Sequence, residues 1–143
     1  MLTAGLAPTL EEGPQNLNDL VFLERMYAAG ARGNFDVLSV MAYGLWTGPG
    51  DRRVDPQRTN FSRPVLIREI MVRRGDEHLP IWASEIGWTA APLHMEAPYG
   101  RVSEAQQGRY AAEAYQRARQ DWPWMGVMCY WFLRRPADYE TSQ

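Results

Sequence analysis

The chain has 143 residues, of which 45% are hydrophobic and 22% are charged, and this composition is typical of a folded domain rather than of a disordered chain. Its net charge of −2 gives no broad attraction to nucleic acid or to an anionic membrane surface. We expect neither a membrane span, which takes roughly 20 apolar residues in a row, nor a signal peptide in this chain. Six Trp and seven Tyr are many for this length, and aromatic side chains serve both cores and sugar-binding sites.

The first half of the chain predicts a strand, a helix and a second strand. Residues 1–7 are small and apolar and end at Pro8, as a short strand does. Residues 16–31 predict a helix, because apolar side chains recur there at three- and four-residue steps and glycines follow. Residues 35–43 form a nearly continuous apolar run, typical of a strand buried on both faces. A loop rich in Gly, Pro, Asp and Arg follows over residues 44–60.

The second half repeats the alternation. Ser62 is expected to cap a helix that Gly75 closes, and residues 78–88 predict the next buried strand. A capping box opens a helix over residues 103–119. Residues 125–133 predict a last apolar strand, and a polar tail follows it.

The predicted order is therefore β-α-β-α-β-α-β, with crossovers long enough for parallel strands. An open doubly wound sheet and part of a (β/α)8 barrel both accept this order, and both place ligands at the carboxyl ends of their strands. A nucleotide-binding sheet needs a glycine-rich phosphate loop after its first strand. Neither G-x-G-x-x-G nor G-x-x-x-x-G-K-[ST] occurs in the sequence, which disfavours the doubly wound, dinucleotide-binding alternative.

Glu85 is the most informative single residue. It lies near the carboxyl end of a strand that is otherwise apolar or small. A carboxylate there is costly to bury unless it is paired, hydrogen-bonded or placed at a wet pocket. A catalytic carboxylate and a structural Glu paired with one of the many arginines both fit this position, and the position alone does not separate them.

Aromatic residues lie at the ends of the neighbouring predicted strands. Tyr43 ends one strand and is followed closely by Trp46, and Trp131 lies near the end of the last strand. Parallel strands would bring Tyr, Glu and Trp to one rim. That combination suits sugar chemistry, since a sugar ring stacks on Trp while a phenol hydrogen-bonds a carboxylate. Core packing is the expected role of the other tryptophans considered, Trp82, Trp122 and Trp124.

The segment ASEIGW, residues 83–88, resembles the strand-seven motif of the retaining glycoside hydrolases built on (β/α)8 barrels, among them the cellulase-like and β-xylosidase-like families. The resemblance implies that Glu85 is the nucleophile, that Tyr43 orients it, and that Trp131 holds the sugar with help from Trp46 or Trp88. The segment 2–8 then resembles strand five, so the resemblance covers nearly the whole chain.

The sequence departs from that family in two places. Many members carry a His shortly before the strand-six Tyr, where this chain has residues 40–42, VMA. Retaining hydrolysis also needs a second carboxyl group about 5–5.5 Å from the first, and in the family it follows an Asn on strand four. No Asn-Glu pair occurs here, and Asp36 starts its strand and is expected at the opposite face. The loop residues Asp51, Asp55 and Glu96 are expected to be solvated charges, although their loops border the rim.

Other candidates point to no further chemistry. His78, His94 and Cys129 share no metal-ligand spacing, so we expect no metal site, and the resemblance implies no cofactor. Cys129 is expected to be a small buried hydrophobic residue. The triplet Asn60-Phe61-Ser62 matches a glycosylation sequon, yet its serine is also the expected helix cap.

We therefore expect residues 1–143 to be a single partial (β/α)8 barrel, strands five to eight with three connecting helices. The expected function is O-glycoside hydrolysis with an oligo- or polysaccharide substrate. The acid/base would come from an amino-terminal barrel half, so the chain alone would show little turnover. A non-catalytic carbohydrate-binding or self-assembling half barrel, pairing with a second copy of itself, is the alternative. An unrelated α/β protein with a structural Glu85 is a third possibility. Localisation stays open, although an exported parent enzyme suits a polysaccharide substrate.

Overall fold

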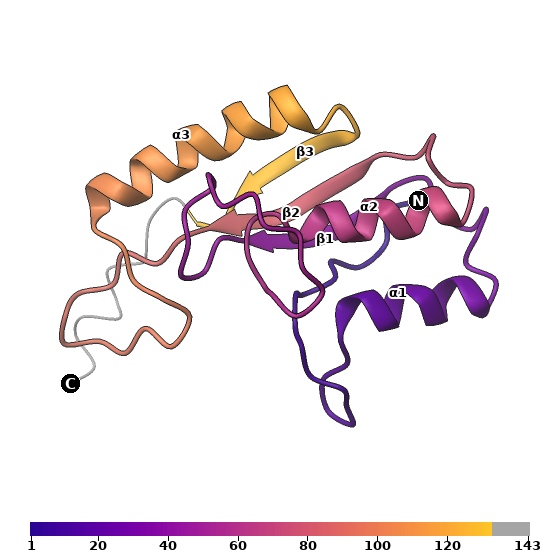
Figure 1. Ribbon diagram of the computed structural model, residues 1–143, viewed down its shortest axis with the longest axis horizontal. Coiled ribbons are helices and arrows are strands. Elements are labelled where there is room, and N and C mark those ends of the chain that lie inside the picture. The colour runs from indigo at the N-terminus through magenta and orange to yellow at the C-terminus, as the bar shows by residue number, and fades with distance from the viewer. Residues whose placement is uncertain (133–143) are drawn as a thin grey trace.

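The computed structural model describes residues 1–132, and in that part of the chain three helices alternate with three strands (Figure 1). The elements are α1 (Asp19–Ala28), β1 (Leu38–Tyr43), α2 (Arg63–Arg73), β2 (Ile81–Gly87), α3 (Glu104–Asp121) and β3 (Met125–Tyr130). The strands pair in parallel in the order β1-β2-β3. The mixed α/β class and the parallel sheet expected from the alternation are confirmed. The predicted tail, and Leu133 at the end of the predicted last strand, lie outside the described residues.

Residues 1–7 do not form the expected strand. They run parallel to β1 and to the residue just before it, but they make only isolated bridges, Leu2 with Val37 and Leu6 with Val40. The Leu6 N–H donates to the Ser39 carbonyl at 3.0 Å, and the Met41 N–H donates to the Leu6 carbonyl at 2.8 Å. This segment therefore takes the place beside β1 that a fourth strand would take, without a continuous ladder.

The helix starts follow local capping chemistry. Asn18 caps α1 with its side-chain oxygen, which accepts from the Leu20 N–H at 3.0 Å, so the helix starts three residues later than the periodicity predicts. The predicted capping box of Ser103 and Gln106 is present at α3. Ser62 lies at the N-cap position of α2, but the prediction that its hydroxyl caps the helix is wrong. That hydroxyl instead donates to the Asp51 carbonyl at 2.5 Å.

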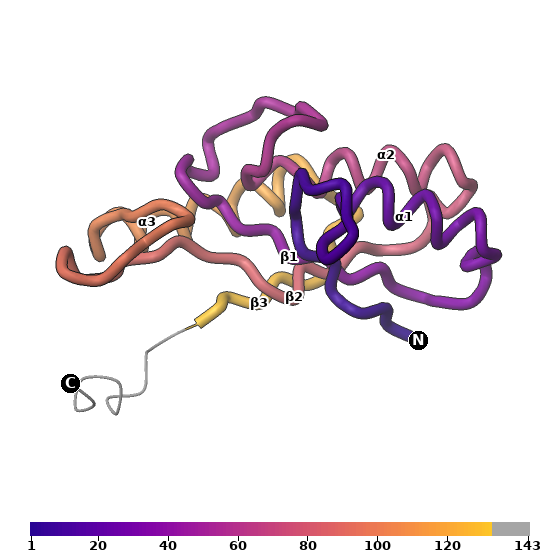
Figure 2. Tube along the Cα trace, turned by 90° about the horizontal axis from the view of Figure 1, so that it is seen from below, coloured from indigo at the N-terminus to yellow at the C-terminus, as the bar shows by residue number. Residues whose placement is uncertain are grey.

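The helices cover one face of the sheet. The side chains of Leu38, Val40 and Ala42 on β1 are at most 2% exposed, and they alternate with Ser39, which is also buried, and with the partly buried Met41 and Tyr43. Figure 2 shows α1, α2 and α3 on one side of the strands. The core between these layers is built from side chains of all three helices and from β1 and β2, with Leu23, Tyr27, Ile67, Met71, Ile81, Ala83, Ile86, Ala114 and Ala118 among its members. Trp122 belongs to this core and Trp124 packs against it, as expected.

No helix covers the opposite face of the sheet within residues 1–132, and side chains of β2 and β3 are exposed there. Trp82 on β2 is 36% exposed and its register partner Val127 on β3 is 37% exposed, so the expectation that Trp82 packs in the core is wrong. Cys129 is exposed too, contrary to the expectation of burial. Both errors have one cause, since these side chains alternate onto the face that no helix covers. No helix in the described residues is both long and apolar enough to cross a membrane.

Candidate functional site

A break in the side-chain alternation of β2 places Glu85. Val40 pairs with Ala83, but the next residue, Met41, pairs with Glu85, so Ser84 is an extra residue on this strand. In regular alternation Glu85 would share the buried face of Ile81 and Ala83. The extra residue turns Glu85 to the open face and returns Ile86 to the core, where it is fully buried. A bulge therefore brings the carboxylate out of the core.

The bulge is held by a hydrogen bond and by close packing. The Ser84 hydroxyl donates to the Val40 carbonyl of β1 at 3.2 Å. On the open face Gly5 approaches so closely that an added β-carbon would lie 2.7 Å from Ser84 Oγ and 3.5 Å from Ser39 Oγ. The two polar residues in succession, Ser84 and Glu85, are the sequence signal of this irregularity.

Tyr43 and Glu85 are brought together. The Tyr43 hydroxyl donates a hydrogen bond to Glu85 Oε2 across the β1–β2 ladder, and both side chains are partly buried. Glu85 forms no ion pair with an arginine of the described residues, so its partner there is a phenol. A phenol that donates to one carboxylate oxygen restricts the rotation of the carboxylate and leaves the other oxygen available. This arrangement is suited to a carboxylate that attacks an electrophile from a defined direction.

Trp131 lies at the same end of the sheet. Its N–H donates to the Ile86 carbonyl at 2.8 Å, directly beside Glu85 in the chain, and its side chain is 56% exposed. Its backbone also packs closely on β2, because a β-carbon added to Gly87 would lie 2.6 Å from the Trp131 carbonyl oxygen. An accessible indole thus stands next to the strand that carries the carboxylate.

The two further candidates for sugar contact, Trp46 and Trp88, differ in their exposure to solvent. Trp46 is 62% exposed on the loop after β1, whereas Trp88 is 5% exposed. The Trp88 ring packs on Phe61 and Tyr110, and its Nε1–H donates to the Thr47 carbonyl at 2.7 Å. The Trp88 ring is thus enclosed and its donor is occupied, and of these two alternatives only Trp46 presents its ring to solvent.

The other carboxylates considered as proton donors have different positions or partners. Asp36 precedes β1 at the amino-terminal edge and pairs with the N-terminal ammonium. Asp51 accepts from Arg53 Nε and Nη2, both at 2.8 Å, and this pairing holds the pKa of the Asp51 carboxyl well below its usual range. Asp55 accepts from the Gln57 N–H in a local turn, and Glu96 lies exposed in the loop after β2. None of these contacts brings a second carboxyl group to Glu85.

Two buried arginines hold the loop between β1 and α2, and the sequence reasoning missed both. Arg63 pairs with Asp19 at 2.6 Å and donates to the Pro56 carbonyl at 2.8 Å. Arg117 donates to the Pro49 carbonyl at 2.6 Å and to Ser62 Oγ at 2.8 Å. Arginine on a predicted helix usually indicates a solvated face, so the sequence carries no local signal of these roles.

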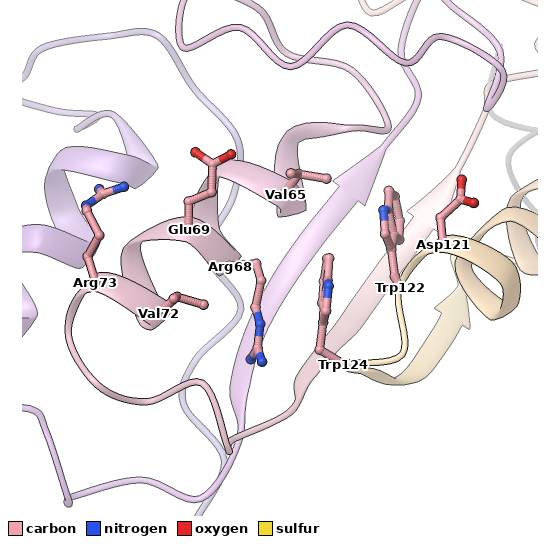
Figure 3. Close-up of a pocket in the computed structure, with 8 residues that line it drawn as sticks. All are labelled: Val65, Arg68, Glu69, Val72, Arg73, Asp121, Trp122 and Trp124. Atoms are coloured by element: carbon pink, nitrogen blue, oxygen red, sulfur yellow. The ribbon is translucent and has the colours of Figure 1, made fainter.

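A separate hollow of about 450 Å³ lies on the helix-covered side, at the amino-terminal end of β3 (Figure 3). It is lined by Val65, Arg68, Glu69, Val72, Arg73, Asp121, Trp122 and Trp124. Arg68 donates to the Leu79 carbonyl at 2.8 Å and its guanidinium lies over the Trp124 ring at 5.8 Å. Arg68, Arg73 and Asp121 are each bonded to another segment of the chain, and the hollow lies far along β3 from Trp131, so we interpret it as a packing groove. Residues 1–132 contain no group of three or more His, Cys, Asp or Glu side chains placed to hold a metal ion.

Comparisons of the chain with protein-family models, with curated proteins and with solved structures return no match. Function is therefore inferred from side-chain chemistry alone.

Proposed function

We propose that this chain forms part of the catalytic domain of a retaining glycoside hydrolase, with Glu85 as the nucleophile. The single observation that carries the proposal is the hydrogen bond from the Tyr43 hydroxyl to Glu85 at the carboxyl edge of a parallel sheet. Exposed Trp131 beside the same strand adds a surface on which a sugar ring can stack.

The proposed reaction proceeds in two displacements. The free oxygen of Glu85 attacks the anomeric carbon, and the bond to the leaving-group oxygen breaks as that oxygen receives a proton from a second carboxyl group. Water, deprotonated by the same second group, then displaces the Glu85 carboxylate and releases the sugar. Tyr43 holds the attacking carboxylate in one orientation, and Trp131 holds the sugar ring.

The barrel portion of the proposal is supported by chain order. Residues 1–7, β1, β2 and β3 lie side by side in the order of the sequence, and the helices between them lie on one face. Consecutive strands with helices on one side are what a singly wound barrel contains. We propose that residues 1–7 and β1 to β3 correspond to strands five to eight.

The proton donor of the proposal comes from outside residues 1–132, because no contact of the acidic side chains considered there brings a second carboxyl group to Glu85. Without that donor, glycosides with poor leaving groups react slowly, while a leaving group that departs as a stable anion needs no proton. The chain by itself should therefore be active only toward activated glycosides.

The test uses 2,4-dinitrophenyl β-glycosides of glucose, xylose and mannose with the chain as it stands. We expect a stoichiometric burst of dinitrophenolate with one of these sugars, and faster steady release with azide, which attacks the glycosyl-enzyme without base catalysis. Glu85→Gln should abolish the burst, and Glu96→Gln, a matched change in an exposed loop, should keep it. A burst that survives in Glu85→Gln contradicts the proposal.

A second candidate function is supported by the open sheet face. Trp82 and Val127 are each more than one third exposed there, and such a face suits a non-catalytic carbohydrate-binding protein that pairs with a second copy of itself. That candidate predicts dimers and retention by polysaccharides in both the parent chain and Glu85→Gln, with no dinitrophenolate burst.

A further inference from the structure

Trp88 packs against the residue that follows Tyr43 in the chain. Its indole fills the space beside Gly44, where an added β-carbon would lie 2.0 Å from Trp88 Nε1 and 2.1 Å from Trp88 Cε2. Gly44 does not have a positive φ, so this position takes glycine for the close approach rather than for its backbone conformation. The Gly44 N–H also donates to the Gly87 carbonyl at 3.3 Å. The residue next to Tyr43 is therefore held between the Trp88 ring and the end of β2.

The turn that leaves β1, residues 44–47, is strained, and the same indole holds it. Leu45 has a φ of +53°, in the left-handed region that residues with a side chain rarely adopt. The Thr47 N–H donates to the Gly44 carbonyl at 3.2 Å, and the Trp88 Nε1–H donates to the Thr47 carbonyl at 2.7 Å. A strained conformation persists only where surrounding contacts hold it, and such residues cluster at functional sites. The Trp88 donor is one of the contacts that hold this turn.

The loop between β2 and α3 packs against the same turn through Gly100. A β-carbon added to Gly100 would lie 2.9 Å from the Leu45 carbonyl oxygen and 3.0 Å from Trp46 Cα. Gly100 has a φ of +93°, a conformation that favours glycine, so its backbone can approach this closely. Contacts from two other segments therefore restrict the turn.

Trp88 links this turn to the carboxylate. Glu85 and Trp88 lie three positions apart at the carboxyl end of β2. Glu85 accepts from the Tyr43 hydroxyl, whereas Trp88 is 5% exposed and holds the turn that follows Tyr43. The Trp88 ring is itself fixed, because Phe61 and Tyr110 pack on it. The segment that carries the carboxylate thus also fixes the backbone beside its hydrogen-bond partner.

We propose that Trp88 is a positioning residue, which fixes the turn after Tyr43 and thereby holds the Tyr43 hydroxyl on Glu85. The inference rests on the proposed function for the reaction that this geometry serves, and it gives Trp88 a role that needs no contact with the sugar. Movement of the turn shifts the backbone of Tyr43, and a misplacement on the order of 1 Å can slow a reaction by about 100-fold. Trp88 acts on the rate only through Tyr43.

The first test observes Tyr43 without any reaction, in the chain labelled with ¹³C at Cζ of its tyrosines. Tyr43→Phe identifies the Tyr43 signal by its loss. Trp88→Phe keeps a ring but removes the indole N–H, and it should shift this signal, because the Cζ chemical shift responds to the hydrogen bond of the hydroxyl. Trp122→Phe is the matched control, since Trp122 is also 5% exposed but packs on Phe61 and Trp124. It should leave the Tyr43 signal in place.

A second pair of variants tests the contact without a change to the tryptophan. Gly44→Ala adds a β-carbon where the indole lies and should also shift the Tyr43 signal. Gly50→Ala, on the same loop, adds a β-carbon that meets no atom within 4 Å and should leave the signal unchanged. This pair decides the question even where Trp88→Phe does not fold.

The burst of dinitrophenolate shows whether Trp88 acts through Tyr43. Trp88→Phe should slow the burst of the parent chain by at least about fivefold. In the Tyr43→Phe background the same change should have no further effect, because the hydroxyl that Trp88 positions is already absent. Equal slowing in both backgrounds would show that Trp88 supports only the fold, and it would overturn the inference.

The positioning role and the proposed function fail in different ways. If the parent chain shows no burst but Trp88→Phe and Gly44→Ala still shift the Tyr43 signal, the positioning of Tyr43 stands without the catalytic function. If the Tyr43 signal keeps its parental position in both variants, the inference is overturned, even where Glu85→Gln abolishes the burst.

Discussion

The hydroxyl of Tyr43 and the carboxylate of Glu85 are hydrogen-bonded across two parallel strands, at the edge where those strands end. The contact depends on the extra residue Ser84, which turns Glu85 to the face of the sheet that Tyr43 shares. A strand with regular alternation would have buried the carboxylate beside Ile81 and Ala83, where the free energy of removing its charge from water would be far larger.

Tyr43→Phe removes this hydrogen bond and little else. Hydrogen bonds to charged groups contribute about 1.5–3 kcal/mol, so formation of the glycosyl-enzyme should slow by about 10- to 150-fold. The burst rate with the dinitrophenyl glycoside measures this step. Sugar affinity should not change, because Tyr43 acts on the carboxylate. The control is Tyr99→Phe, a change at an exposed tyrosine, which should keep the parental burst rate. An unchanged burst rate in Tyr43→Phe would show that Tyr43 does not position the Glu85 carboxylate.

Trp88 and Trp131 should respond differently to truncation. Trp88→Ala empties a core position between Phe61 and Tyr110 and should lower the free energy of unfolding by about 3–5 kcal/mol. Trp131→Ala removes a side chain that is 56% exposed and should change it by less than about 0.5 kcal/mol, while weakening sugar binding. Urea denaturation followed by circular dichroism measures both. Equal destabilisation by the two variants would contradict the different burial of the two rings.

Arg117→Met should release the loop between β1 and α2. The Arg117 side chain is 8% exposed, and its guanidinium donates to the Pro49 carbonyl and to Ser62 Oγ and lies over the Trp122 ring at 4.9 Å. Its loss leaves buried acceptors without a donor and should lower the free energy of unfolding by about 3 kcal/mol.

Limited trypsin digestion measures how accessible this loop is, because trypsin cleaves after arginine and the loop contains Arg52, Arg53 and Arg58. Arg117→Met should be cut there faster than the parent chain at equal folded fraction. Arg119→Met, an exposed change on the same helix, should be cut at the parental rate. Parental protection of this loop in Arg117→Met would show that Arg117 does not hold it.

Asp51→Asn should lower stability in a pH-dependent way. Arg53 donates to both carboxylate oxygens, which keeps the pKa of Asp51 below its ordinary value. A carboxyl group with a lowered folded-state pKa stabilises the fold fully above its ordinary pKa of about 4, and this contribution declines as the pH falls below that value. The variant should therefore be about 1 kcal/mol less stable at pH 7, since Arg53 is largely exposed, and the difference should shrink below pH 4.

Urea titrations at several pH values measure this difference. Asp55→Asn provides the control, because Asn retains the oxygen that accepts from the Gln57 N–H. A difference between Asp51→Asn and the parent chain that grows on acidification would contradict the assignment.

The sequence predicted the α/β class, the parallel sheet and the capping box of α3, because hydrophobic periodicity and local capping carry those features. It did not predict the burial of Trp88 or the exposure of Trp82 and Cys129. Those outcomes depend on which face of each strand the helices cover, and a continuous apolar run does not reveal that. The succession of Ser84 and Glu85 was a readable signal of the bulge, since two polar residues interrupt the alternation.

The roles of Arg63 and Arg117 could not be read from the sequence. Both guanidinium groups donate to backbone carbonyls of a loop that approaches them only after the chain has folded. Every residue has a backbone carbonyl, so the residue types of the loop do not reveal these acceptors. The approach of Gly100 to Trp46 is of the same kind, because it joins loops more than fifty positions apart.

The most direct test of Glu85 as a nucleophile is peptide mapping of the chain after reaction with 2,4-dinitrophenyl 2-deoxy-2-fluoro-β-glycosides. The fluorine slows hydrolysis of the glycosyl-enzyme, so the ester to the nucleophile accumulates. We predict that mass spectrometry finds the added fluorosugar on Glu85, within the peptide that spans β2, and that Glu85→Gln takes up none. Fluorosugar attached to any other residue, or equal labelling of Glu85→Gln, would contradict the assignment of Glu85.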